Sequence, residues 1–172
     1  EELIDPLMYK IGEMWQLNEL SVAKEHLATS LVDEVVSDFI KDNFIKENNN
    51  PIVITSTVGD ESHNLGIKIV GKFLESHGFN VKNLSTKLTN KDLINSVYAI
   101  KPQLVLLSIT LPSNIATIQQ IVKELKSDPN LFSGKIVVGG QGLFSTDKVV
   151  SIKDVDFCSR NLEDLESFLK EI

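Results

Sequence analysis

A histidine and a carboxylate stand two residues apart in one polar loop of this sequence. Glu61 and His63 lie within Val58–Gly66, which follows a short β-branched run. A neutral imidazole can bind a transition metal through one ring nitrogen, while a nearby carboxylate accepts the proton on the other and fixes the tautomer. Gly66, in the first turn of the helix expected next, leaves room for a bulky group. A lone histidine in such a loop is also commonly a solvated or capping residue.

Hydroxyls and paired glycines follow two later β-branched runs. Ser108 and Thr110 come at the end of one run, and Gly139 and Gly140 follow another. Hydroxyls can hydrogen-bond to a polar ligand, and glycines let a ligand approach the backbone closely. Glycines after a strand are often turn residues only, and a serine there can simply cap the next segment. The interpretation as a ligand site therefore rests on where these features fall together.

The second part of the chain has the pattern of an α/β domain. Short β-branched runs occur at Ile52–Thr57, Phe79–Asn83, Gln103–Ser108, Lys135–Val138 and Val155–Cys158. Four helix-length stretches separate them, and a fifth runs from about Asn161 to Ile172. This predicts a doubly wound, five-stranded parallel sheet of flavodoxin-like order 2-1-3-4-5. Strands one, three and four are then neighbours, so the features above are expected at one carboxyl edge, where such sheets bind ligands.

The first part of the chain has helical periodicity. Leu7, Ile11 and Trp15 recur every four residues after Asp5-Pro6, a typical helix start. Ser21 is expected to cap a second helix, whose apolar stripe contains Leu27, Leu31, Val35 and Phe39. Because a two-helix hairpin cannot bury so wide a stripe, we expect either further helices before Glu1 or a partner over this face.

The boundary between the two parts is expected in the polar run 46–51, which is rich in asparagine and closed by proline. The predicted domains are a helical module at residues 1–47, the remnant of a helix bundle, and a Rossmann-like domain at residues 48–172.

Composition narrows the classes of function. The 172 residues carry a net charge of -7 and no basic stripe interleaved with aromatics, so this segment is a poor nucleic-acid binder by itself. No apolar run approaches the roughly 18 residues of a membrane span, and no secretory signal is evident. A cytoplasmic protein is expected. The single Cys158 excludes a disulfide framework or a thiolate zinc cluster and is most simply a buried structural thiol.

The ligand features together resemble a known signature. Glu61-x-His63-x-x-Gly66, Ser108-x-Thr110 and Gly139-Gly140 are similar to the Asp-x-His-x-x-Gly, Ser-x-Leu/Thr and Gly-Gly motifs of cobalamin-binding domains that bind the cofactor base-off with a histidine on cobalt. Glu replaces Asp at the first position. The resemblance implies that His63 is the lower cobalt ligand and that the benzimidazole tail lies in a cleft. The residues implied to bind the cofactor in this domain are Glu61, Ser62, His63, Gly66, Ser108, Thr110, Gly139 and Gly140.

A second motif lies in the helical part. Trp15, nine intervening residues and then Glu25-His26 resemble the Trp-x9-Glu-His motif of cobalamin-dependent photoreceptor regulators, the CarH/LitR group of the MerR superfamily. The resemblance implies that these three residues surround the upper cobalt ligand. It also implies a homo-oligomer that reaches DNA through a helix-turn-helix domain preceding Glu1. Some members have a histidine directly after the tryptophan that captures cobalt after photolysis, but this chain has Gln16 there.

The function that follows from these resemblances is a binding module and not an enzyme. We expect the cobalamin-binding sensor domain of a light-responsive transcription regulator, with adenosylcobalamin as cofactor and methylcobalamin or hydroxocobalamin as alternatives. The main alternative is a corrinoid methyl-carrier protein of a methyltransferase system. The cobalamin-binding part of an isomerase ranks lowest, because such enzymes need a separate catalytic barrel.

Overall fold

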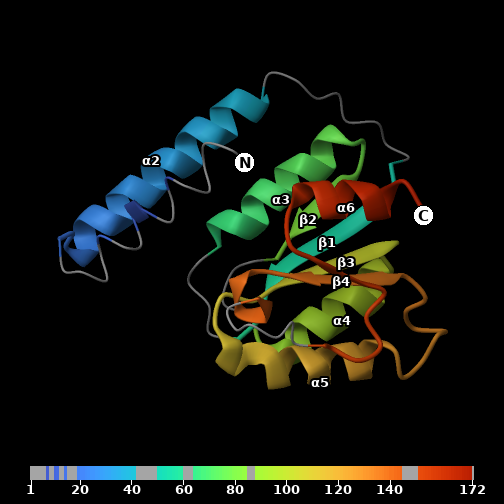
Figure 1. Ribbon diagram of the computed structural model, residues 1–172. Coiled ribbons are helices and arrows are strands. Elements are labelled where there is room, and N and C mark those ends of the chain that lie inside the picture. Colours follow the sequence, from blue (N-terminus) through green and yellow to red (C-terminus); the bar gives the residue numbers. More distant parts are fainter. Residues whose placement is uncertain are drawn as a thin grey trace. The chain divides into compact units, whose positions relative to one another are not determined.

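The chain divides into two compact units, Glu1–Ile45 and Lys46–Ile172. The computed structural model describes residues 7, 10–11, 14, 19–41, 50–59, 64–84, 88–144 and 151–171. The long helix α2 belongs to the first unit, and all the strands belong to the second (Figure 1). No helix in the described part of the chain is long and apolar enough to cross a membrane.

Helix α2 spans Val22–Lys41 and begins after the predicted cap. The Lys24 backbone N–H donates to Ser21 Oγ at 3.4 Å, a long hydrogen bond that still places the hydroxyl at the helix start. On α2, Leu27, Leu31 and Val35 are 61%, 53% and 68% exposed. Three apolar residues at intervals of four thus form an uncovered stripe, as expected for a face too wide for a hairpin to bury. Of the first predicted helix, the four described residues are all helical: Leu7, Lys10, Ile11 and Met14.

The second unit contains a five-stranded, wholly parallel sheet in the order β2-β1-β3-β4-β5. The strands are β1 at Ile52–Thr57, β2 at Asn80–Asn83, β3 at Leu104–Ser108, β4 at Lys135–Gly139 and β5 at Phe157–Ser159. Fold class and strand order are therefore confirmed. The bounds of β1 agree with the prediction, and those of the other strands differ by one or two residues.

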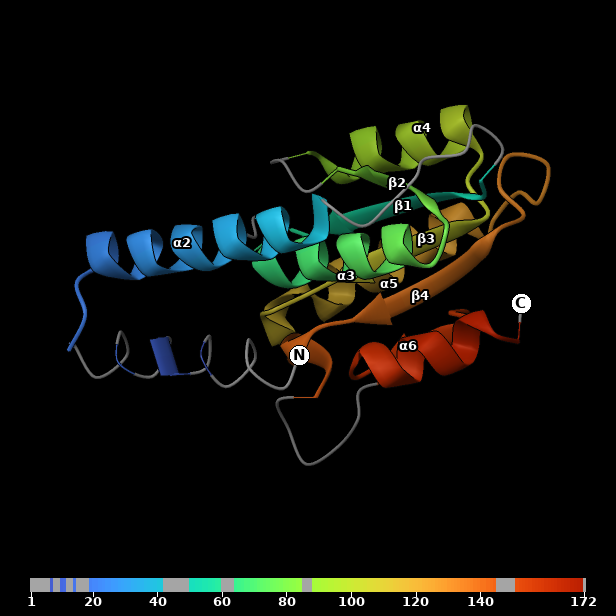
Figure 2. The same cartoon turned by 90° about the horizontal axis from the view of Figure 1, so that it is seen from above.

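Helices cover both faces of the sheet (Figure 1 and Figure 2). They are α3 at Leu65–Ser76, α4 at Asn90–Ile100, α5 at Ile115–Leu125 and α6 at Leu162–Leu169, with short 3-10 helices η1 at Pro112–Asn114 and η2 at Gln141–Leu143. Two helix starts are capped, because Thr89 accepts the Asp92 N–H and Asn161 accepts the Asp164 N–H.

The connection from β4 to β5 differs from the prediction. An α-helix is expected there from sequence, but the described residues 140–144 and 151–156 contain only η2. Gly140 has a φ of 96°, which turns the chain sharply at the end of β4. A Cβ on Gly142 would lie 2.9 Å from the Leu111 carbonyl carbon. The backbone therefore packs closely against the loop after β3, and two glycines disfavour a helix at this point.

Alternation along the strands divides the apolar residues between two cores. The core against α4 and α5 contains the strand residues Ile54, Val105, Leu107, Ile136 and Val138. The core against α3 and α6 contains Val53, Leu104, Leu106 and Val137. Because successive side chains in a strand point to opposite faces, the face of a strand's last residue can be deduced from the residues before it.

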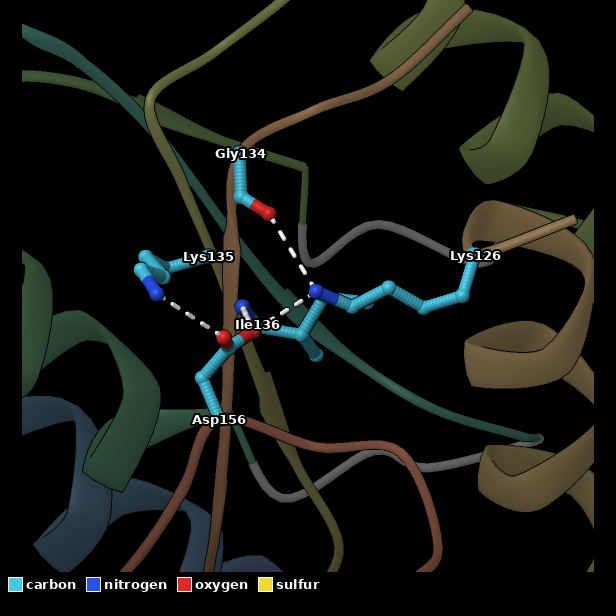
Figure 3. A network of polar contacts seen from close by, with 5 residues as sticks. All are labelled: Lys126, Gly134, Lys135, Ile136 and Asp156. Carbon is cyan, nitrogen blue, oxygen red and sulfur yellow. Dashed lines mark hydrogen bonds and ion pairs between the residues drawn. The ribbon is translucent and has the colours of Figure 1, made fainter. Parts of the chain in front are cut away.

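Asp156 ties the short strand β5 to the start of β4 (Figure 3). Its carboxylate accepts hydrogen bonds from Lys126 Nζ at 2.8 Å, from the Ile136 N–H at 2.8 Å and from Lys135 Nζ at 3.2 Å. Burial alone would raise the pKa of this carboxyl, but the hydrogen bonds from Lys126, Ile136 and Lys135 outweigh burial and lower it below the ordinary value. The ionised carboxylate therefore stabilises the fold.

Replacing this carboxylate tests its contribution. Asp156→Asn is expected to lower the free energy of unfolding by about 1–3 kcal/mol at neutral pH, because charged hydrogen bonds are lost in a largely buried place. Since the folded pKa lies below the unfolded one, the contribution is complete above the unfolded pKa and disappears as the pH falls through the folded one. Urea unfolding from about pH 7 down to about pH 3 should show the difference between the two proteins shrinking.

Asp154→Asn is the matched control, since Asp154 is exposed and the charge change is the same. Asp154→Asn should change the free energy of unfolding little at any pH. An Asp156→Asn effect that is independent of pH, or one shared by Asp154→Asn, would contradict the assignment.

Candidate functional site

Four small residues lie side by side at the carboxyl edge of the sheet. Thr57 pairs with Ser108, Ser108 with Gly139, and Gly139 with Ser159, so the last residues of β1, β3, β4 and β5 form one row. Ser108, Gly139 and Ser159 each lie two residues after a strand residue packed in the α3 and α6 core, and Thr57 lies four residues after Val53 of the same core. Alternation therefore directs this row toward the same side. We call these four residues the edge row. Across four adjacent strands, this face ends without a bulky side chain.

The two glycines after β4 let the backbone pack tightly beside the edge row. With its φ of 96°, Gly140 adopts a conformation that favours glycine, and a Cβ there would clash with the Ile109 carbonyl and lie 2.9 Å from Ser108 Oγ. A Cβ on Gly139 would lie 3.1 Å from the Ser159 carbonyl oxygen. The protein's own packing thus requires at least Gly140, which lies close against Ile109 and Ser108.

This requirement can be separated from simple backbone strain. Gly140→Ala should lower the free energy of unfolding by at least about 2 kcal/mol, because left-handed strain is added to a steric clash. Gly78→Ala is the control, since Gly78 also has positive φ, at 84°, but a Cβ there meets nothing within 4 Å. It should cost only about 1 kcal/mol, from strain alone. If urea unfolding showed the same decrease in the free energy of unfolding for both variants, the clash at Gly140 would be relieved at no cost.

The loop predicted to carry the metal ligand starts beside the edge row. The Val58 N–H donates to the Ser108 carbonyl at 3.1 Å. Gly59 follows with a φ of 83°, and a Cβ there would lie 2.6 Å from Asn114 Oδ1 in η1. The first described residues of the loop therefore lie against the connection after β3. Glu61, Ser62 and His63 themselves lie outside the described residues.

The other residues predicted from sequence are only partly placed. Gly66 is the second residue of α3, and a Cβ there would meet nothing within 4 Å among the residues that the structure describes, so their packing does not require glycine at this position. Thr110 is half-buried two residues beyond β3. Glu25 and His26 belong to α2, but their side chains, like the whole of Trp15, lie outside the described residues. The structure thus brings together Ser108, Gly139 and Gly140, as the predicted strand order requires.

Three further residues of the site are missed by the sequence analysis. Thr57 and Ser159 complete the edge row, and Asn114 contacts the start of the loop. Thr57 and Ser159 could have been found, because they end or follow two of the predicted strands. Asn114 has no comparable signal, since its position depends on the 3-10 helix before α5. Beneath Thr57 on the same face, the buried Thr55 hydroxyl has no hydrogen-bond partner in the described part of the chain.

Cys158 in β5 agrees with the structural role expected for it. It is half-buried and packs against the α4 and α5 core. Burial raises the pKa of its thiol more than a backbone hydrogen bond at Ile152 lowers it. The thiol is therefore protonated at neutral pH and a poor nucleophile.

Comparison with known proteins identifies the domain. A model of the B12 binding domain matches residues 51–168, which include the whole edge row, and a second B12 binding domain model matches residues 1–37. The chain belongs to the B12 binding domain family. It is thus a cobalamin-binding domain, as the resemblance of its motifs predicts.

Individual relatives agree with this family. The HTH-type transcriptional repressor CarH of Myxococcus xanthus is 26% identical over 108 residues, which is 63% of this chain and 36% of the repressor. The chain thus spans about a third of the length of this curated relative. The monomethylamine corrinoid protein of Methanosarcina barkeri superposes with a TM-score of 0.75 at 17% identity, over 96% of this chain and 78% of that one. A cobalamin-binding protein from Desulfitobacterium hafniense DCB-2 gives 0.59 at 22% identity, over 95% and 77%.

At these identities the solved structures show the fold alone. The relatives are named as a repressor, a corrinoid protein and a cobalamin-binding protein. The edge of the described domain also fits the cofactor. Its edge row offers hydroxyls and a face free of bulky groups.

Proposed function

We propose that this chain is the cobalamin-binding sensor domain of a light-responsive transcription regulator. The observation that carries the cofactor assignment is the edge row, which lies beside the start of the loop bearing His63. The motif Trp15-x9-Glu25-His26 and the similarity to the repressor CarH favour a regulator. Binding is base-off, with adenosylcobalamin as the cofactor and His63 on cobalt.

The residues of the second unit hold the lower side of the cofactor. His63 donates a ring nitrogen to cobalt, and Glu61 accepts the proton on the other ring nitrogen, which fixes the tautomer and raises ligand basicity. Ser108 and Thr110 offer hydroxyls to the nucleotide tail, and Gly139 and Gly140 allow it to approach the backbone. When bound, the cofactor supplies a cobalt–carbon bond that light can cleave.

The residues of the helical unit hold the upper side. Trp15, Glu25 and His26 are the residues that would surround the upper ligand. A ligand shifts a conformational equilibrium only through contacts that differ between the two states. Contacts of Trp15, Glu25 and His26 with the upper ligand would be such contacts, and their loss would change assembly and, with it, DNA binding through a helix-turn-helix domain outside this chain. Gln16 provides no imidazole to replace the lost ligand.

The alternative is a corrinoid methyl-carrier protein in a cytoplasmic methyltransferase system. The likeness to the monomethylamine corrinoid protein, with a TM-score of 0.75 over 96% of this chain, favours it. Both functions use the same lower side of the cofactor. They differ in what happens above cobalt: a carrier must leave that face open to a methyl donor and acceptor, whereas a sensor covers it.

Reconstitution in the dark distinguishes these functions. The protein is loaded with adenosylcobalamin or methylcobalamin, and absorption spectra and size-exclusion profiles are recorded before and after green light. A sensor retains adenosylcobalamin and changes its assembly on illumination. Methyl transfer to a thiol acceptor without an assembly change would favour the carrier, and no affinity for any corrinoid would refute both.

Histidine variants test the cobalt ligand. His63→Ala should lose the base-off, histidine-on spectrum. His77→Ala is the matched control, because His77 Nδ1 lies 2.8 Å from the Phe73 carbonyl oxygen at the end of α3 and serves as a helix cap. It should keep the spectrum even if the helix end is weakened. An unchanged spectrum in His63→Ala would remove His63 from the coordination sphere.

Gly66 separates cofactor binding from stability. Gly66→Ala should raise the free energy of unfolding of the free protein by about 0.5 kcal/mol, since a Cβ there meets nothing and alanine favours a helix. If the cofactor passes this position, the same variant should bind cobalamin more weakly. Denaturant unfolding and spectral titration measure the two effects, and unchanged affinity would mean that the cofactor lies elsewhere.

A further inference from the structure

Arg160 supplies an isolated positive charge at the edge where ligands bind. It is the one arginine of the sequence and directly follows Ser159, the last residue of the edge row. Among the described residues within five positions beyond the carboxyl ends of the strands, it is the only cationic side chain. The chain as a whole carries a net charge of -7. A cation at this place is therefore not explained by a generally basic surface.

The guanidinium is oriented but not neutralised. Its central carbon lies 5.3 Å from the centroid of the Phe144 ring, beyond β4, and the side chain is exposed. The Asp164 carboxylate accepts the backbone N–H of Arg160 at 3.1 Å. In the described part of the chain no carboxylate forms an ion pair with the guanidinium. Its planar fork of donors is thus held by an aromatic ring and left available to a ligand.

Cobalamin offers one group that matches this fork. Its peripheral side chains are neutral amides, and the phosphodiester between the corrin ring and the ribose of the nucleotide tail is its anionic group. In the base-off mode proposed above, the nucleotide tail would lie along the face of the edge row, which would bring its phosphodiester to the carboxyl edge of the sheet. Arginine binds two phosphate oxygens at once, which a lysine cannot do with the same geometry.

We propose that Arg160 binds the phosphodiester of the cofactor's nucleotide tail, an inference that rests on the base-off binding mode proposed above. Phe144 positions the guanidinium over the end of the sheet. Ser159, one residue earlier, ends the row along which the tail lies.

Three corrinoids that differ in the tail test the assignment. Cobalamin has the phosphodiester and the base, cobinamide phosphate has a phosphate without the base, and cobinamide has neither. Spectral titration of Arg160→Gln should show affinities for cobalamin and cobinamide phosphate reduced about tenfold to a hundredfold, as expected for a lost charged hydrogen bond. Affinity for cobinamide should be unchanged. The affinities of Arg160→Lys should lie between those of the unaltered protein and those of Arg160→Gln, because the positive charge is kept and the planar fork of donors is lost.

Lys123→Gln is the charge-matched control, an exposed residue in the last turn of α5. It should bind all three corrinoids like the unaltered protein, and thermal unfolding should show that both variants are folded. Equal losses for cobinamide and cobalamin in Arg160→Gln, or equal losses in the two variants, would overturn the role of Arg160. If the unaltered protein binds none of the three corrinoids, the proposed function falls, and this inference falls with it.

Discussion

The parallel register of the sheet is the constraint on which the site depends. Parallel strands end at the same edge, and a side-chain period of two fixes which face each last residue meets. Four strands whose last residues are Thr57, Ser108, Gly139 and Ser159 therefore present small groups in one row, although the first and last are about a hundred positions apart in sequence. A shift of one residue in any strand would send its member of the row to the opposite core. The strand register thus places these four small residues in one row before any ligand is bound.

The packing of the protein itself requires glycine at position 140. Its positive φ and its contact with the Ile109 carbonyl require glycine even in the absence of a ligand. The close packing of Gly140 against Ser108 is then a consequence of how β4 leaves the sheet. Gly66 is different, because nothing in the described part of the chain would contact a Cβ there. A glycine that the fold does not need is stronger evidence for a ligand than one that it does.

Sequence periodicity was sufficient to predict the sheet, its order and the meeting of Ser108 with Gly139. These follow from β-branched runs and from the rule that parallel strands share an edge. The connection from β4 to β5 was predicted wrongly in its described part, because close backbone packing at Gly142 outweighs the helical length of that stretch. Asn114 could not have been predicted to lie against Gly59, since this contact depends on the tertiary arrangement of two loops. Thr57 and Ser159 needed only the register, which sequence does not state to within one residue.

The two ends of the sheet carry different kinds of interaction, and one supports the other. At the start of β4, the Asp156 carboxylate is fixed by Lys126, Lys135 and a backbone N–H. Strand β5 has only three residues, so few ladder hydrogen bonds hold it in register. Asp156 precedes Ser159 by three residues, roughly 10 Å along an extended chain. The charged hydrogen bonds of Asp156 near the amino end of β5 therefore help to fix the positions of Ser159 and Arg160 at its carboxyl end. Because the edge row consists of small residues, the rigidity of this edge has to come from such interactions elsewhere in the strand.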